Sequence, residues 1–504
     1  MSLAIVYSRA STGIRAPLVT VEVHLSYGLA GLHMVGLPEA TVKESKDRVR
    51  SALMNSHFEF PIRRITVNLA PADLPKEGGR FDLPIALGIL AASGQIPKNV
   101  LNEYEFVGEL ALSGELRPVH GVLPVVLGAH QANRKLIVPA ANTEEAALVK
   151  QAAVFTAKHL LEICAALQGK QTLPQCNVSH ALQKTESKLD FSDVKGQPHA
   201  KRALEIAACG SHSVIFVGPP GAGKTMLASR LPGILPELTD EEALESASIA
   251  SVSSGGFNPH DWRQIPFRSP HHTSSSVALV GGGRPPKPGE ISLAHRGVLF
   301  LDELPEFQRH ALECLREPLE SGQITISRAA YQTVFPAQFQ LIAAMNPCPC
   351  GYAGSKPNRC ECSPEQIKRY AGKISGPLLD RIDMQVTIRS VSPETLAQIG
   401  AKNEECSQVI NKRVCEVRQL QLARQGKYNA ALMVVDLKQC QISSQAEKLL
   451  QYAMNKLELS ARVYHRLLKV ARTISDIDQK ETIDEQAVSE ALTYRSLDHA
   501  KSGL

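Results

Sequence analysis

Apolar and polar residues alternate with different periods along the chain, and this divides it into three blocks. The first block mixes short strand-like runs with helix-like ones. Its predicted strands cover 19–25, 64–70 and 135–140, and its predicted helices cover 82–94, 143–153 and 159–169. A polar stretch with a proline and no clear period follows, which is typical of a linker.

The second block alternates short apolar strands with helices, as buried parallel sheets do. Its strands are predicted at 213–218, 297–303, 340–346 and 384–388. The Gly-, Pro- and Ser-rich stretch 253–290 is too long for a plain connection, so we interpret it as a functional insertion. Residues 321–340 alternate around RAAY and predict a β-hairpin.

The third block is helical throughout by its periodicity. Ser444 with Glu447, and Thr482 with Glu485, have the spacing of capping boxes and indicate two helix starts. We therefore predict an α/β multidomain protein. Its parts are a mixed α/β domain over 1–168, a linker over 169–189, a parallel-sheet core over 190–391 and a helical domain over 392–504.

Composition narrows the class of protein without naming it. The chain has 504 residues, 43% of them hydrophobic, which excludes a mainly disordered protein. Its 55 basic and 50 acidic residues give a net charge of +5, which permits a nucleic-acid partner but does not argue for one. No apolar run approaches the ~18 residues of a membrane span and no secretory leader is visible, so we expect a cytoplasmic protein with reduced cysteines.

A glycine-rich loop lies between a predicted strand and a predicted helix. GPPGAGKT matches the Walker A pattern in its required context, so backbone N–H groups would surround phosphates at a helix N-terminus. Lys224 would reach the β- and γ-phosphates, and Thr225 would hold Mg²⁺. The predicted ATP-binding residues here are Gly218, Pro219, Pro220, Gly221, Ala222, Gly223, Lys224, Thr225 and Met226.

Polar residues follow two further predicted strands. Asp302 and Glu303 end the strand GVLFLDE, where Asp302 would bind Mg²⁺ and Glu303 would deprotonate the attacking water. Asn346 ends QLIAAMN, at the edge where open α/β sheets bind ligands, and could position that water as a sensor. The sequence therefore predicts an Mg²⁺-dependent ATPase.

Four cysteines form two closely spaced pairs. Cys348, Cys350, Cys360 and Cys362 have the number and type of ligands of a tetrahedral Zn²⁺ site, although C-x-C pairs are less usual than C-x₂-C. Free reduced thiols and disulfides are the alternatives. The other seven cysteines are scattered, as buried structural thiols are.

The order of these motifs resembles AAA+ ATPases, and the whole chain resembles the YifB/ComM family of magnesium-chelatase-like proteins. The segments that carry the likeness include FRSPHHTSSSVALVGGGRPPKPGE, NPCPCGY and GPLLDRIDM. The resemblance implies an AAA+ P-loop core with a helical lid, assembled as a homohexamer. It implies an arginine finger at Arg381, a lid contact to the γ-phosphate from Arg462 with Arg466 as competitor, and an adenine pocket at Val194 and Gly196.

The segment PKEGGRFDLPIALGILAASG resembles the proteolytic domain of Lon. Arg80 stands at the position that matches the nucleophilic serine, and Val125 stands near the position of the lysine that would activate it. A serine–lysine dyad needs a hydroxyl and an amine, so the resemblance implies a Lon-protease-like α/β domain without the catalytic dyad.

The resemblance also implies what the motor acts on. In the related proteins the hairpin before the sensor strand points into the ring pore, where cations would track a phosphate backbone without reading bases. The corresponding residues are Arg328, Tyr331, Arg284 and Lys287, and purely structural hairpins are the alternative.

Four functions are then open. The first is a helicase-type DNA translocase for branch migration of recombination intermediates in natural transformation, with recombination proteins as further partners and no membrane. The others are an ATPase subunit of a metal chelatase, a Lon-like ATP-dependent protease and a non-enzymatic scaffold. The absent dyad opposes the protease, and the intact Walker residues oppose the scaffold.

Overall fold

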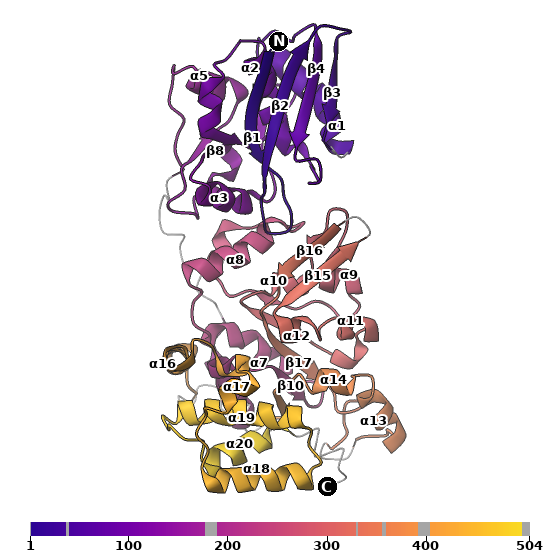
Figure 1. Cartoon of the computed structure of the whole chain (residues 1–504). Coiled ribbons are helices and arrows are strands. Elements are labelled where there is room, and N and C mark those ends of the chain that lie inside the picture. Colours follow the sequence, from indigo (N-terminus) through magenta and orange to yellow (C-terminus); the bar gives the residue numbers. More distant parts are fainter. Residues whose placement is uncertain are drawn as a thin grey trace.

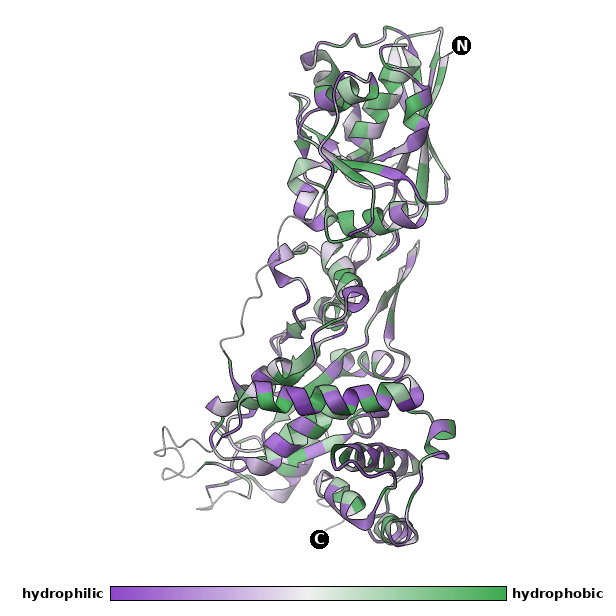
Figure 2. Cartoon of the chain, turned by 90° about the vertical axis from the view of Figure 1, so that its left-hand side faces the viewer, coloured by the Kyte–Doolittle hydropathy of each residue, from purple (hydrophilic) through white to green (hydrophobic). Residues whose placement is uncertain are grey.

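The computed structural model describes residues 2–36, 40–176, 189–328, 331–354, 359–391 and 404–495. The N-terminal α/β domain lies at one end of an elongated molecule, the helical lid lies at the other end, and the core lies between them (Figure 1). Strands of the two sheets are largely hydrophobic, and helices at the surface carry hydrophilic turns (Figure 2). Within the described residues, no helix has the length and apolar character that crossing a membrane requires.

A seven-stranded mixed sheet forms the N-terminal domain, in the order β3-β4-β2-β1-β5-β8-β9. β2 alternates buried and half-exposed residues because one face packs on the apolar helix α2, which is buried on all sides. The strands are β1 (Ser2–Arg9), β2 (Leu18–Ser26), β3 (Gly31–Val35), β4 (Arg64–Ala70), β5 (Tyr104–Phe106), β8 (Lys135–Pro139) and β9 (Val154–Ala157), with a small hairpin of β6 (Glu109–Leu110) and β7 (Leu116–Arg117). The helices are α1 (Ala40–Asn55), α2 (Asp82–Ala92), α3 (Val122–Gln131), α4 (Thr143–Ala146) and α5 (Leu160–Leu167).

Two expectations for this domain need comment. The predicted helix over 143–153 is wrong beyond Ala146, because the chain turns there and enters β9 beside β8. The predicted linker begins with described residues that still pair with the domain, since the Cys176 amide donates to the Val154 carbonyl over 2.9 Å. Linker residues 177–188 lie outside the described residues.

The core contains a five-stranded parallel sheet in the order β11-β14-β17-β10-β18. All four strands predicted from apolar runs are confirmed, and the short edge strand β11 was missed. The strands are β10 (Val214–Val217), β11 (Phe267–Arg268), β14 (Val298–Leu301), β17 (Gln340–Met345) and β18 (Met384–Thr387). The helices are α6 (Pro198–Gly210), α7 (Lys224–Arg230), α8 (Asp240–Ser251), α9 (Ser276–Val280), α10 (Glu290–Leu293), α11 (Arg309–Glu313), α12 (Pro318–Ser321), α13 (Pro364–Ala371) and α14 (Gly376–Leu379).

Two hairpins project from the core. The predicted hairpin over 321–340 is confirmed as β15 (Gln323–Arg328) with β16 (Tyr331–Pro336). The insertion contains a shorter hairpin of β12 (Gly281–Gly282) and β13 (Lys287–Pro288). The two hairpins pack closely. A Cβ added at Gly281 would lie only 2.7 Å from the Ile326 side chain. Residues 329–330 at the longer hairpin's tip lie outside the described residues.

The helical lid contains α16 (Ser407–Gln425), α17 (Val434–Leu437), α18 (Ser444–Lys456), α19 (Ala461–Ile477) and α20 (Glu485–Thr493). The N-terminal domain reaches the core at the other end, through α8. The Ser251 hydroxyl donates to Glu145, Lys150 pairs with Asp240 at 2.9 Å, and Ala247 joins the apolar cluster around α3. The N-terminal domain is therefore fastened to the insertion side of the core.

Candidate functional site: a P-loop at the carboxyl edge of the core sheet

The loop between β10 and α7 forms an open cradle. Gly221 and Gly223 adopt left-handed φ values of +74° and +87°, and a Cβ at either would meet no atom within 4 Å. Gly218 is a glycine for a different reason, because a Cβ there would lie 2.4 Å from the Ile388 carbonyl oxygen. The loop thus has the open, backbone-lined shape and the helix N-terminus that phosphates require.

Lys224 lies inside this cradle and is only 9% exposed. Its ammonium donates to the Gly218 and Pro219 carbonyls over 2.7 and 3.0 Å, and to the Asn346 side-chain oxygen over 3.0 Å. Burial lowers the pKa of Lys224, and the charges of Asp302 and Glu303 counteract that change. Residues from three distant motifs therefore meet at one point, as the sequence predicted.

The two residues proposed for Mg²⁺ are also in contact. The Thr225 hydroxyl donates to an Asp302 carboxylate oxygen over 2.7 Å. A hydroxyl and a carboxylate oxygen at this separation can share one hard cation, so the donor set fits Mg²⁺.

Glu303 follows Asp302 in a left-handed conformation, with φ at 51°, and its side chain is 51% exposed. A carboxylate oxygen of Glu303 lies 3.1 Å from Nδ1 of His272, within the 253–290 insertion. His272 was not among the predicted site residues, because its only signal in the sequence is a His-His pair beside a serine-rich run.

Arg381, expected to be an arginine finger, is only 8% exposed. Its guanidinium donates to the Pro377 carbonyl over 2.7 Å and pairs with Glu320 at 2.5 Å. The alternative to a finger role was a surface ion pair with the neighbouring Asp380 or Asp383, but the ion pair described for Arg381 is with Glu320. To act in a neighbouring active site, Arg381 has to exchange the Glu320 carboxylate for a phosphate.

The lid arginines lie away from the P-loop of the same chain. Helix α19 contacts residues that lie just before two strands of the core sheet. Arg466 pairs with Asp383, which precedes β18. The Thr473 hydroxyl lies 2.8 Å from Nε2 of His212, which precedes β10. Those residues mark the amino edge of the parallel sheet, whereas Lys224 lies at its carboxyl edge, about 13 Å away along four-residue strands. Arg462 is exposed and makes no hydrogen bond or ion pair within the described part of the chain.

The segment proposed for adenine lies beside the P-loop. The Gly196 amide donates to Glu404 over 3.1 Å, and Gln197 reaches the Ala222 carbonyl over 3.5 Å. Val194 is 3% exposed and belongs to the core cluster, so it is less accessible to a base than expected.

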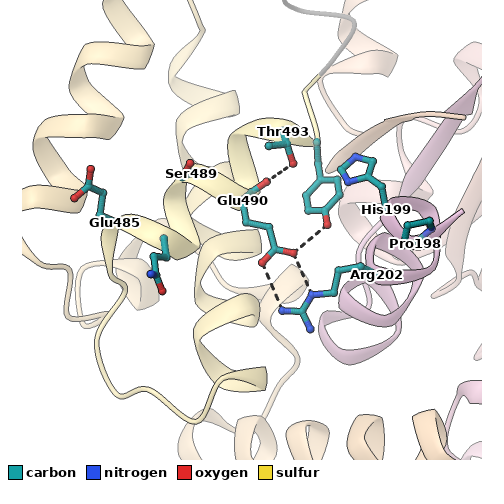
Figure 3. A pocket seen from close by; sticks show the side chains of 9 residues that line it. Pro198, His199, Arg202, Glu485, Ser489, Glu490 and Thr493 are labelled. Carbon is teal, nitrogen blue, oxygen red and sulfur yellow. Dashed lines mark hydrogen bonds and ion pairs between the residues drawn. The ribbon is translucent and has the colours of Figure 1, made fainter. Parts of the chain in front are cut away.

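A separate hollow of about 630 Å³ lies between α6 and α20 (Figure 3). Arg202 donates to Glu490 over 3.1 Å, the Tyr494 hydroxyl donates to the same carboxylate over 3.1 Å, and the ring of His199 stacks on Tyr494. These contacts fasten the last lid helix to the core, so we assign them a structural role.

The four clustered cysteines meet as the spacing predicted. Their ligand sulfurs all lie within 4.8 Å of one another, and those of Cys348, Cys350 and Cys360 are 3.3 to 3.7 Å apart. The Tyr352 amide and the neighbouring thiols lower the pKa of Cys350 to about 6. All eleven cysteines lie within the described residues, and each is a free thiol. The group could hold a metal ion.

Of the residues proposed for DNA, Arg284 is exposed on the turn between β12 and β13, and Lys287 is exposed at the start of β13. Arg328 and Tyr331 face each other in register at the end of the longer hairpin, and their side chains lie outside the described residues. At the positions compared with the Lon dyad, Arg80 donates to the His120 carbonyl over 2.8 Å and Val125 is buried.

Comparison with known proteins agrees with this geometry. A family model described as "Magnesium chelatase, subunit ChlI" matches residues 190–396, "Subunit ChlI of Mg-chelatase" matches 21–142, and "Magnesium chelatase, subunit ChlI C-terminal" matches 404–495. Competence protein ComM of Haemophilus influenzae is 54% identical over 99% of this chain and 98% of its own length. Uncharacterized protein YifB of Escherichia coli is 52% identical over the same shares. The chloroplastic magnesium-chelatase subunit ChlI of Chlamydomonas reinhardtii is 25% identical over 47% of this chain and 61% of its own.

A P-loop, an acidic pair and a polar sensor at one edge of a parallel sheet, with a helical lid, define the AAA+ class of ATPases. The chain belongs to the ComM/YifB family of magnesium-chelatase-like AAA+ ATPases.

Proposed function

We propose that the chain is the subunit of a homohexameric, ATP-driven motor that translocates on DNA. Its task would be branch migration of recombination intermediates in natural transformation, with recombination proteins as partners. The observation that carries this proposal is the pair of exposed cations, Arg284 and Lys287, on an insertion hairpin packed against the longer hairpin. The full-length similarity to a competence protein supports the cellular role.

ATP, Mg²⁺ and, in the four-cysteine loop, Zn²⁺ are the bound groups of this motor. Thr225 and Asp302 would hold Mg²⁺, which supplies charge neutralisation at the phosphates. Lys224 would bind the phosphates, Asn346 would orient the attacking water, and Glu303 would accept its proton.

A ring is part of the proposal because one chain does not complete the site. α19 is held at the amino edge of the sheet, and Arg381 is paired with Glu320. A neighbouring subunit would supply both Arg381 and a lid arginine, Arg462 or Arg466, to the γ-phosphate. Six chains would also bring six copies of each hairpin around one pore, and each hairpin would add cations toward a phosphate backbone.

The test is ATP hydrolysis by the full chain with and without single-stranded or branched DNA. We expect stimulation by both DNAs, no ATP binding in Lys224→Ala, and ATP binding with hydrolysis lowered by about 100-fold or more in Glu303→Gln, the range that general base catalysis contributes. Images with an ATP analogue and DNA should show six-fold rings. DNA that neither binds nor stimulates the ATPase refutes the motor.

An ATPase subunit of a metal chelatase is the second candidate, favoured by the three family models that match the chain. It predicts stimulation by a porphyrin-binding partner in place of DNA. A Lon-like protease is opposed by Arg80 and Val125 at the positions of the dyad.

A further inference from the structure

The four-cysteine loop begins two residues after Asn346, and its sulfur spacing suits a single tetrahedral metal ion. A tetrahedral ion with Zn–S bonds of about 2.3 Å separates its sulfurs by about 3.8 Å. The sulfurs of Cys348, Cys350 and Cys360 lie 3.3 to 3.7 Å apart, and all four sulfurs fit within 4.8 Å. An iron–sulfur cluster binds its thiolates on separate iron atoms and needs a wider cage. The donor set therefore suits a single Zn²⁺ ion.

The four-cysteine loop also packs against the P-loop. Gly351 has a left-handed φ of +87°, and a Cβ there would lie 2.7 Å from Pro220 and 3.8 Å from the Asn346 side chain. The Gly351 amide donates to the Cys348 carbonyl over 3.0 Å, which closes the turn that carries the first two thiols. A shift of this turn would move the residues that surround Lys224.

The far side of the loop returns to Asn346 as well. Cys362 is followed by Ser363, which caps α13 through the Gln366 amide at 3.3 Å. On that helix, Tyr370 is 6% exposed, and the Asn346 backbone lies against its hydroxyl, where it lowers the pKa of Tyr370 against the stronger effect of burial. Asn346 thus lies against α13 through its backbone, and its side-chain oxygen accepts from Lys224 over 3.0 Å.

We propose that the zinc loop is a positioning element of the ATPase: the ion joins the two sides of the loop and so fixes Asn346 and Pro220 around the phosphate site. Cys348 and Cys350 lie on the Asn346 side, and Cys360 and Cys362 lie on the α13 side. Without the ion, the two sides are joined only through hydrogen bonds and packing. This inference rests on the proposed role of Asn346 in ATP hydrolysis, and it does not depend on DNA.

The first measurement is the metal content of the full chain purified without chelator. We expect one zinc per chain, and a Co²⁺-substituted protein with the absorption of a tetrahedral thiolate site. Cys360→Ser should lose the metal, whereas Cys362→His, which keeps a zinc ligand, should retain it. The control is Cys314→Ser, outside the cluster, whose thiol donates to the His310 carbonyl over 3.3 Å. No metal, or iron in place of zinc, would overturn the assignment.

The second measurement separates positioning from folding. In Cys360→Ser we expect kcat for DNA-free ATP hydrolysis to fall about 10- to 100-fold while ATP affinity changes little, because a displacement of about 1 Å is enough for such a loss. Cys362→His should restore most of kcat, and Cys314→Ser should not lower it. A Cys360→Ser protein that loses zinc and keeps full kcat would refute the positioning role. Failure of DNA to stimulate any variant would bear on the motor alone.

Discussion

His272 and Glu303 are joined across the catalytic edge of the core sheet, with 3.1 Å between Nδ1 and a carboxylate oxygen. His272 belongs to the 253–290 insertion, whereas Glu303 follows Asp302 directly after β14. The proposed base and the proposed DNA-contacting insertion therefore share a direct contact.

We predict that His272→Ala raises DNA-free ATP hydrolysis. A carboxylate held by an imidazole is less available to an attacking water, so removing the imidazole frees Glu303. An exposed pair of this kind contributes about 0.4–1 kcal/mol, which corresponds to a rate increase of about two- to fivefold. Steady-state assays with and without DNA check it, and the stimulation by DNA should shrink by the same factor. In a Glu303→Gln background the substitution should have no effect; an effect there, or a slower single variant, contradicts the prediction.

The residues of the P-loop, the acidic pair and Asn346 could be predicted because their chemistry depends on local context. Each follows an apolar strand of a parallel sheet, and the carboxyl ends of such strands meet at one edge. Their partners could not be predicted in this way. No local pattern marks His272, Glu320 or Tyr370 as partners of Glu303, Arg381 or Asn346, and only the packing of their segments reveals these contacts.

The starts of two lid helices, α18 and α20, also could not be located from the local sequence alone. The sequence placed caps at Ser444 and Thr482, but the caps are Ser443, which accepts from the Ala446 amide, and Asp484, which accepts from the Ala487 amide. Ile442 and Ile483 form a parallel bridge, so the backbone stays extended up to these residues. A contact between distant segments sets both starts. At Ser363 and Gln366, where no such bridge is present among the described residues, the capping-box spacing coincides with an actual capping box.

We predict that Arg284→Ala combined with Lys287→Ala weakens DNA binding and leaves ATP affinity unchanged. Both cations are exposed on the insertion hairpin. The slope of log affinity against log salt should fall by about one for each cation that contacts a phosphate. Fluorescence anisotropy across a salt series measures this slope. Lys448→Ala with Lys456→Ala removes the same charge from α18 of the lid, so an equal loss in that control would indicate only a net-charge effect.

The ion pair between Arg466 of the lid and Asp383 of the core predicts that the stability of the folded chain depends on pH. Burial alone would raise the pKa of Asp383, but Arg466, His212 and Lys469 outweigh burial and lower it. A carboxyl with a lowered folded pKa contributes stability above its unfolded pKa of about 3.9, and the contribution is lost as the pH falls through the folded value.

Arg466→Ala should therefore lower the thermal midpoint of the core at neutral pH, by an amount equivalent to about 2 kcal/mol, below the roughly 3–5 kcal/mol of a fully buried pair because Arg466 is partly exposed. The difference from the unsubstituted chain should narrow below about pH 4. Scanning calorimetry at several pH values measures it, with the exposed Arg462→Ala as the matched control on the same helix. A difference that stays constant with pH would contradict the linkage.

The proposal that Arg381 acts as an arginine finger in a neighbouring subunit can be tested with mixed rings. Arg381→Ala should bind ATP but hydrolyse it about 10³-fold more slowly or worse, since that is the contribution of an arginine finger. Glu303→Gln is inactive for a different reason, because it lacks the base in its own site. In mixed rings, an Arg381→Ala subunit keeps its base and receives Arg381 from a Glu303→Gln neighbour, so an equal mixture should regain up to about a quarter of full activity. Mixing Lys224→Ala with Glu303→Gln should regain none, because both changes disable the subunit's own site. If rings that mix Arg381→Ala with Glu303→Gln subunits remain inactive, Arg381 is not a finger. Its role is then the structural ion pair with Glu320 that the single chain shows.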